Sequence, residues 1–129
     1  MRILGIDFGE KKIGLAEACG KLALPFGIID NTKEGIQKLK KICQEEEIDK
    51  VVIGLPLNLD GTEGKMAKKV RSFGQELERN LGLMICFWDE RLTTKEAKGE
   101  IKHKREDDTA AAIMLQSYLD SKKEGRKNV

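Results

Sequence analysis

Ile3-Leu4-Gly5-Ile6-Asp7-Phe8 is an almost uninterrupted apolar run that ends at an acidic residue and a turn containing Gly9. Such a run is typical of a central strand that is buried on both faces of a sheet. Asp7 is therefore expected near the carboxyl end of this strand. A carboxylate inside a buried run costs free energy unless it is paired or binds a metal, so Asp7 is a candidate functional group. A turn-forming aspartate before Gly9 is the alternative.

The segments downstream predict an α/β fold in the order βββαβαβα. Two further apolar stretches, at residues 13–16 and ending at Ile29, follow after short turns that leave no room for a crossover helix. The first three strands should therefore form an antiparallel meander. Helical spacing and β-branched runs predict the other elements: a helix from Asn31 to about Glu47, a strand at 51–55, a helix through 66–81 stopped by Gly82, a strand at 83–88, a short helix opened by Thr93, and a last helix from about Asp107. The small residues 110–112 should let this last helix pack close to the sheet.

Length and composition indicate one domain, which we place at residues 1–121, followed by a Lys-rich tail at 122–129. Hydrophobic residues make up 40% and charged residues 36% of the 129 residues, which excludes a disordered chain. No apolar run approaches the roughly 18 residues of a membrane span. Asp7 interrupts the N-terminal apolar stretch before it could serve as a signal peptide, so a cytoplasmic location and no membrane partner are expected.

Cysteine, histidine and net charge narrow the possible functions. Cys19, Cys43 and Cys86 are far apart and form no C-x-x-C pair, so neither a disulfide framework nor a zinc site is predicted. His103 is the single histidine, which argues against a histidine-based nucleophilic triad and leaves at most a phosphate contact. The net charge of +2 is weak support for a nucleic-acid partner, so any basic surface must be local.

Three acids stand where predicted strands end or a helix begins: Asp7, Glu90 and Asp107. If the first and fifth strands approach each other, these acids converge. Hard cations such as Mg²⁺ prefer carboxylate oxygens, and phosphoryl chemistry with two metal ions requires a cluster of carboxylates. The spacing leaves alternatives open, because Asp89 is as acidic as Glu90, and Glu90 could pair with Arg91. Aspartates at the start of a helix are also commonly N-caps.

Loop and basic residues offer possible phosphate contacts. The stretch 56–65 joins a buried strand to a helix, and its glycines could let backbone amides approach a phosphate, although a plain connection explains them equally well. Basic residues could line one side of the acidic cluster and hold a polyanion, although such runs more often form a solvated face. These residues are Lys65, Lys68, Arg91, Lys95, Lys98, Lys102, Lys104 and Arg105.

Four motifs together resemble the YqgF family over almost the whole chain, from Arg2 to about Asp120. They are Gly5-Ile6-Asp7-Phe8-Gly9 with Ile13-Gly14-Leu15-Ala16, Gly54-Leu55-Pro56-Leu57-Asn58 with Asp60-Gly61-Thr62, Asp89-Glu90-Arg91-Leu92-Thr93-Thr94, and Asp107-Asp108-Thr109-Ala110-Ala111-Ala112 with the helix that follows. The resemblance implies an RNase H-like α/β fold related to the RuvC resolvases, with a mixed five-stranded sheet flanked by helices.

The resemblance also implies a site. The family's metal-binding and catalytic acids fall on Asp7, on Glu90 rather than Asp89, and on Asp107 rather than Asp108. Because Asp107 and Asp108 are adjacent, either could bind the metal while its neighbour caps the helix. Family members often have arginine at the position of Lys12, and lysine lacks the planar fork that grips a phosphate through two hydrogen bonds. The expected nucleic-acid contacts are Lys12, Asn58, Thr62, Lys65, Lys68, Arg91, Lys104 and Arg105.

These implications predict a metal-dependent endonuclease that hydrolyses phosphodiester bonds with Mg²⁺ or Mn²⁺. The preferred substrate is the 5′ end of the 16S ribosomal RNA precursor, and a four-way DNA junction is the alternative within the same chemistry. A non-catalytic RNA-binding module remains the rival from another class. A kinase-like ATPase is disfavoured, because such proteins close two lobes around their nucleotide. A monomer or a homodimer is expected, and a junction cutter should be a dimer with two sites.

Overall fold

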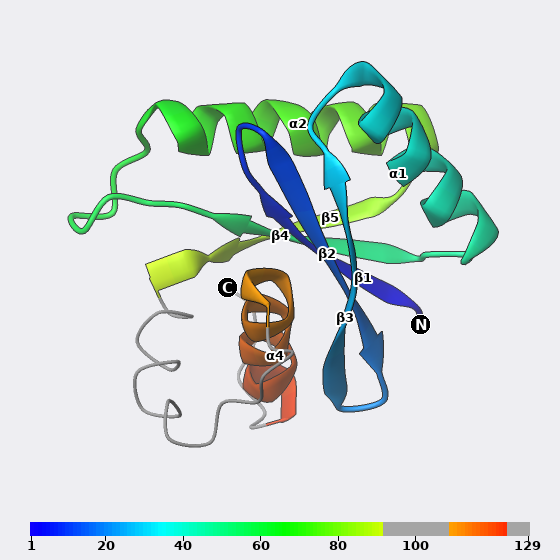
Figure 1. Cartoon of the computed structure of the whole chain (residues 1–129). Helices are drawn as coiled ribbons and strands as arrows, with labels where there is room; N and C mark the ends of the chain where they lie inside the picture. The colour runs from blue at the N-terminus through cyan, green and yellow to red at the C-terminus, as the bar shows by residue number, and fades with distance from the viewer. Residues whose placement is uncertain (92–108, 124–129) are drawn as a thin grey trace.

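A computed structural model of the chain describes residues 1–91 and 109–123, and Figure 1 shows their arrangement. The described residues form, in order, β1 (Ile3–Phe8), β2 (Lys12–Cys19), β3 (Leu22–Asp30), α1 (Lys33–Glu45), β4 (Lys50–Leu55), α2 (Lys65–Leu81), β5 (Met84–Asp89) and α4 (Ala110–Lys123). This order agrees with the prediction over these ranges. The short helix expected after Thr93 and the expected start of the last helix at Asp107 lie outside the described residues.

The five strands form one mixed sheet in the order β3-β2-β1-β4-β5. The pairs β1–β2 and β2–β3 are antiparallel, as expected for the meander, whereas β1–β4 and β4–β5 are parallel. The carboxyl ends of β1, β4 and β5 therefore meet at one edge of the sheet. Ile6 pairs with Ile53 and Gly54 pairs with Trp88, so Asp7, Gly54 and Trp88 follow one another across three neighbouring strands.

Helices cover both faces of the sheet (Figure 1). On one face, α1 and α2 pack over a core that includes Leu39, Ile53 and Phe73. On the other face, α4 packs over a second core in which Leu115 and Tyr118 are fully buried. Burial on both faces explains why β1 and β4 are almost continuously apolar. No helix in the described part of the chain is long and apolar enough to cross a membrane.

The first helix begins one residue later than the sequence predicted. Thr32, and not Asn31, is the N-cap of α1, and its hydroxyl accepts a hydrogen bond from the Gly35 N–H at 3.1 Å. Asn31 is still held against the sheet, because its backbone N–H donates to the Lys11 carbonyl at 2.9 Å and its side chain donates to the Gly9 carbonyl at 2.7 Å. The end of α2 agrees with the prediction, since Gly82 caps it in the left-handed conformation with φ 65°.

The close approach of α4 to the sheet depends on glycine in β1. A Cβ atom at Gly5 would lie 2.9 Å from the Cβ of Leu115, whereas one at Gly14 would lie at an ordinary 3.6 Å from the Cβ of Ala111. The helix therefore packs directly on the β1 backbone at Gly5, and the small residues predicted at its start allow this.

Gly5→Ala is expected to lower the free energy of unfolding by about 1–3 kcal/mol, because the new methyl group forces α4 away from β1. Equilibrium unfolding in urea measures this loss. Gly27→Ala is the matched control, since a Cβ at Gly27 on β3 would meet no atom within 4 Å. Equal stability of the two variants would show that α4 does not need this close contact.

Candidate active site

Asp7 and Glu90 come together at the edge of the sheet where β1, β4 and β5 end. Asp7 is the fifth residue of β1, and Glu90 directly follows β5. Both side chains are half-buried, and their carboxyl groups share a hydrogen bond. The structure thus places two of the three acids singled out from the sequence against each other, although 83 residues separate them in the chain.

Gly54 of β4 makes room for this contact. Strand β4 lies between β1 and β5, so a side chain at this level would stand between the two acids. A Cβ at Gly54 would collide with the Glu90 carboxylate and would lie 3.0 Å from Glu90 Cγ. Glu90 therefore lies across the bare backbone of β4 towards Asp7. In the sequence, Gly54 stands out only as part of a motif, but a glycine at the end of a β-branched buried strand is also a signal of close approach by another group.

The electrostatics of the pair favour bound positive charge. Burial raises the pKa of Asp7 above its ordinary value. Burial raises the pKa of Glu90 to about 7, and the negative charge of Asp7, the hydrogen bond to Asp7 and the charge of Asp89 act in the same direction. Near neutral pH the pair therefore tends to retain a proton between its carboxyl groups. Two half-buried carboxyl groups whose negative charges repel each other are stabilised by a divalent cation, and they supply the hard oxygen donors that such a cation prefers.

Asp89 occupies a different environment from Glu90. Arg91 donates from Nη2 to Asp89 Oδ2 at 2.7 Å and from Nε to both carboxylate oxygens at 3.1 Å. The hydrogen bonds from Arg91 hold the pKa of Asp89 below its ordinary value. Within the described residues, the ion pair of Arg91 is thus with Asp89 rather than with Glu90. Asp89 is held by Arg91, while Glu90 is the acid that lies against Asp7.

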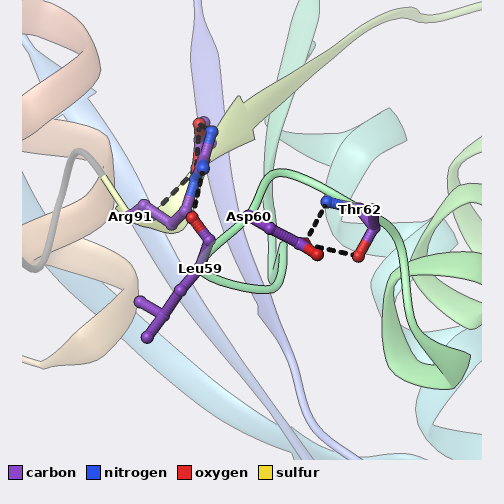
Figure 2. Close-up of polar contacts among 5 residues, drawn as sticks. Leu59, Asp60, Thr62 and Arg91 are labelled. Carbon is purple, nitrogen blue, oxygen red and sulfur yellow. Dashed lines mark hydrogen bonds and ion pairs between the residues drawn. The ribbon is translucent and has the colours of Figure 1, made fainter.

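Residues 56–64, which we call the Leu59 loop, connect β4 to α2 and carry two of the expected nucleic-acid contacts. Asn58 Nδ2 donates to Thr62 Oγ1 at 2.9 Å, and Thr62 Oγ1 in turn donates to Asp60 at 2.6 Å. The Thr62 N–H also donates to Asp60, at 3.0 Å (Figure 2). These bonds give Asn58 and Thr62 a role in shaping the loop. Contact of either residue with nucleic acid stays a prediction.

The basic residues expected to bind nucleic acid lie in different surroundings. Lys65 and Lys68 are exposed in the first turn of α2, next to the Leu59 loop. Gly64 caps this helix without a side-chain hydrogen bond. Lys12 forms an exposed ion pair with Asp30 across β2 and β3. Lys104 and Arg105 lie outside the described residues.

The third acid of the predicted cluster cannot be placed beside the pair, because Asp107 and Asp108 lie outside the described residues. Within residues 1–91 and 109–123, no group of three or more potential ligands comes together to hold a metal. Asp7 and Glu90 therefore form a two-carboxylate centre in the described part of the chain. The assignment of these four acids as metal ligands stays a prediction.

Solved structures show to which class this fold belongs. The RuvC protein of Thermus thermophilus, solved with a Holliday junction substrate, has a TM-score of 0.67 at 14% sequence identity, over 98% of this chain and 97% of that one. A fowlpox virus resolvase, solved with Holliday junction DNA, has a TM-score of 0.54 at 15% identity, over 94% and 98% of the two chains. At these identities the likeness establishes the fold alone. It confirms the predicted RNase H-like class with a mixed five-stranded sheet flanked by helices.

Sequence relatives identify the family within this class. Residues 1–121 match the RuvX family, described as Holliday junction resolvase. A protein from Syntrophus aciditrophicus is 42% identical, over 94% of this chain and 89% of its own length. A protein from Syntrophomonas wolfei is 38% identical, over 93% and 94%. Both are named "Putative pre-16S rRNA nuclease".

The chain therefore belongs to the RuvX family, which is the YqgF family that its motifs resemble. Membership confirms the predicted enzyme class, a nuclease that hydrolyses phosphodiester bonds, and with it a nucleic-acid partner.

Proposed function

We propose that this nuclease is metal-dependent and matures the 5′ end of the 16S ribosomal RNA precursor. The observation that carries the metal requirement is the half-buried pair of Asp7 and Glu90 at the end of β1 and β5. The names of relatives that this chain matches over most of their length support the choice of RNA. A cytoplasmic site of action follows from that substrate and is part of the proposal.

Asp7 and Glu90 would hold Mg²⁺ or Mn²⁺, together with Asp107 or its neighbour Asp108. Such a cation, when bound, polarises the phosphate and lowers the pKa of water, so that hydrolysis needs no covalent intermediate. The half-buried carboxylates of Asp7 and Glu90 would fix the position of this cation at the ends of β1 and β5. Lys65 and Lys68 would attract the phosphates of the strand that approaches along α2. Lys12, Arg91, Lys104 and Arg105 are further proposed contacts.

A Holliday junction resolvase is the second candidate, because the RuvX family carries that description and the fold is shared with junction-bound resolvases. Cutting a junction symmetrically requires two sites that face paired strands, so this candidate implies a homodimer. The RNA nuclease can act as a monomer.

The substrate is tested with end-labelled ribosomal RNA precursor and a labelled four-way DNA junction, each incubated with Mg²⁺, Mn²⁺ or EDTA. We expect cutting of the RNA with either cation and no cutting in EDTA, because the carboxylate pair alone supplies no positive charge. Sedimentation with and without the junction shows the oligomeric state. Preferential cutting of the junction by a dimer would replace the RNA proposal with the resolvase, and RNA binding without any cutting would favour the non-catalytic module.

A further inference from the structure

Leu59 is the most exposed large apolar residue in the described part of the chain. Its exposed fraction is 95%, compared with 67% for Ile28 and 45% for Leu22. Single exposed leucines are common on protein surfaces, but they usually lie along neighbouring atoms and keep part of their surface dry. An exposure this high means that the backbone of the Leu59 loop holds the side chain away from the protein.

Hydrogen bonds fix the shape of the loop on both sides of Leu59. The Gly61 N–H donates to the Asn58 carbonyl at 2.8 Å, and the Asn58 N–H donates to the Thr62 carbonyl at 2.9 Å. Below them, Leu57 and Glu63 form an isolated β-bridge. Glu63 accepts two hydrogen bonds of 2.8 Å from Arg71 of α2. The loop is therefore a closed, braced turn, and its tip does not need a hydrophobic contact to keep its conformation.

A further hydrogen bond ties this tip to Arg91, the residue that follows Glu90. Arg91 Nη1 donates to the Leu59 carbonyl at 3.2 Å, as Figure 2 shows. The same guanidinium is anchored by Asp89, and Arg91 directly follows Glu90 in the chain. Leu59 thus lies within the length of one arginine side chain from the end of β5, where Glu90 contacts Asp7.

We propose that Leu59 is an apolar wedge that enters between two stacked bases of the nucleic acid, where paired nucleotides meet unpaired ones, and so positions the phosphate to be cut. This inference rests on the proposed function of the site. Apolar side chains inserted at a base step unstack it and bend the duplex. The exposed Lys65 and Lys68 beside the loop suit the flanking phosphates.

A protein partner explains this arrangement less well. A stable protein interface buries about 800 Å² on each partner, which one protruding leucine cannot supply. The residues next to Leu59 at the tip, Asn58, Asp60 and Gly61, are exposed and polar or small, so they extend no apolar surface around it. Insertion into a base stack needs only one apolar side chain that is held rigidly.

The test uses full-length protein carrying Asp7→Asn, so that hydrolysis does not consume the probe. The probes are an RNA hairpin with a single-stranded 5′ extension and a four-way DNA junction, each with 2-aminopurine at the paired base next to the discontinuity. Fluorescence of 2-aminopurine rises when it is unstacked. Leu59→Ala, Leu59→Met and Leu22→Ala are added separately to the Asp7→Asn protein. Leu22→Ala is the matched control, since Leu22 is exposed on β3, the outer strand on the side of the sheet opposite β5.

We expect the parent protein to raise the fluorescence of at least one probe, and Leu59→Ala to lose most of that rise. Affinity for the structured probe should fall about tenfold, while affinity for the single strand stays unchanged. Leu59→Met should keep both the fluorescence rise and the affinity for the structured probe, because methionine is apolar and of similar size. Leu22→Ala should behave as the parent.

The wedge is overturned if no probe shows a rise, if Leu59→Ala keeps the full rise, or if Leu22→Ala causes the same loss. These outcomes are distinct from failure of the proposed function. A fluorescence rise that depends on Leu59, in a protein whose wild type cuts neither substrate, would support the wedge and reject the nuclease proposal for that site. If the wild type cuts a substrate and the fluorescence rise is the same with and without Leu59, only the wedge proposal is rejected.

Discussion

Asp7→Asn is expected to reduce metal-dependent cleavage roughly 10³-fold, because the substitution removes one of the carboxylates that would hold the cation. Asparagine has nearly the same shape as aspartate, so the packing of β1 should survive. Single-turnover cleavage of the labelled substrate, with protein in excess over RNA, measures the chemical step without interference from product release. Glu90→Gln should cause a loss of the same order.

Glu34→Gln is the matched control for this pair of substitutions. Glu34 is an exposed acid in the first turn of α1 and is not part of the Asp7–Glu90 pair. The Glu34→Gln variant should therefore cleave the substrate as fast as the wild type does. If Asp7→Asn cut as fast as Glu34→Gln, Asp7 would be a structural residue, and the non-catalytic module would become the better explanation of a chain that still binds RNA.

The same variant gives a second readout that does not depend on activity. In the metal-free protein, burial raises the pKa of Glu90 to about 7, and the negative charge of Asp7 and its hydrogen bond contribute to this rise. Asparagine removes the charge, so the pKa of Glu90 should fall, while burial keeps it above its ordinary value. Carbon-detected NMR titration of the Glu90 carboxyl group follows this change. An unchanged pKa would mean that the two carboxyl groups do not interact in solution.

The sequence predicted the elements well because their signals are local. The run from Ile3 to Phe8 has the pattern of a doubly buried strand, and Gly82 is a strong helix stop. The start of α1 was misplaced by one residue because both Asn31 and Thr32 can cap a helix. Only the three-dimensional contacts with Gly9 and Lys11 show that Asn31 still belongs to the sheet edge.

The site could be predicted only in part, because it depends on contacts between distant strands. Residue spacing identified Asp7 as costly to bury, but could not choose between Asp89 and Glu90, which are adjacent acids after one strand. The choice made by the family resemblance agrees with the geometry, in which Asp89 is engaged by Arg91 and Glu90 lies against Asp7. The role of Gly54 could be recognised only from the strand order. Its missing side chain matters because β4 lies between β1 and β5.

Gly54→Ala is expected to lower cleavage by about 10²-fold, because a misplacement of a catalytic group by 1 Å can have an effect of that size. The new Cβ collides with the carboxylate of Glu90 and comes within 3.0 Å of its Cγ, so Glu90 must move off β4. The displaced group is a side chain at the edge of the sheet, not backbone. The free energy of unfolding should therefore change by only about 1 kcal/mol, which urea unfolding measures.

Gly27→Ala in β3 is the control for this experiment. A Cβ at Gly27 would meet no atom within 4 Å, so the stability and the cleavage rate of this variant should both stay near those of the wild type. Titration of Mn²⁺ into each variant, followed by calorimetry, should show weakened binding for Gly54→Ala and near wild-type binding for Gly27→Ala. If Gly54→Ala retained full activity and Mn²⁺ affinity, the reaction would not require Glu90 to lie across β4 beside Asp7. The metal centre would then have to be built from Asp7 and acids outside the described residues.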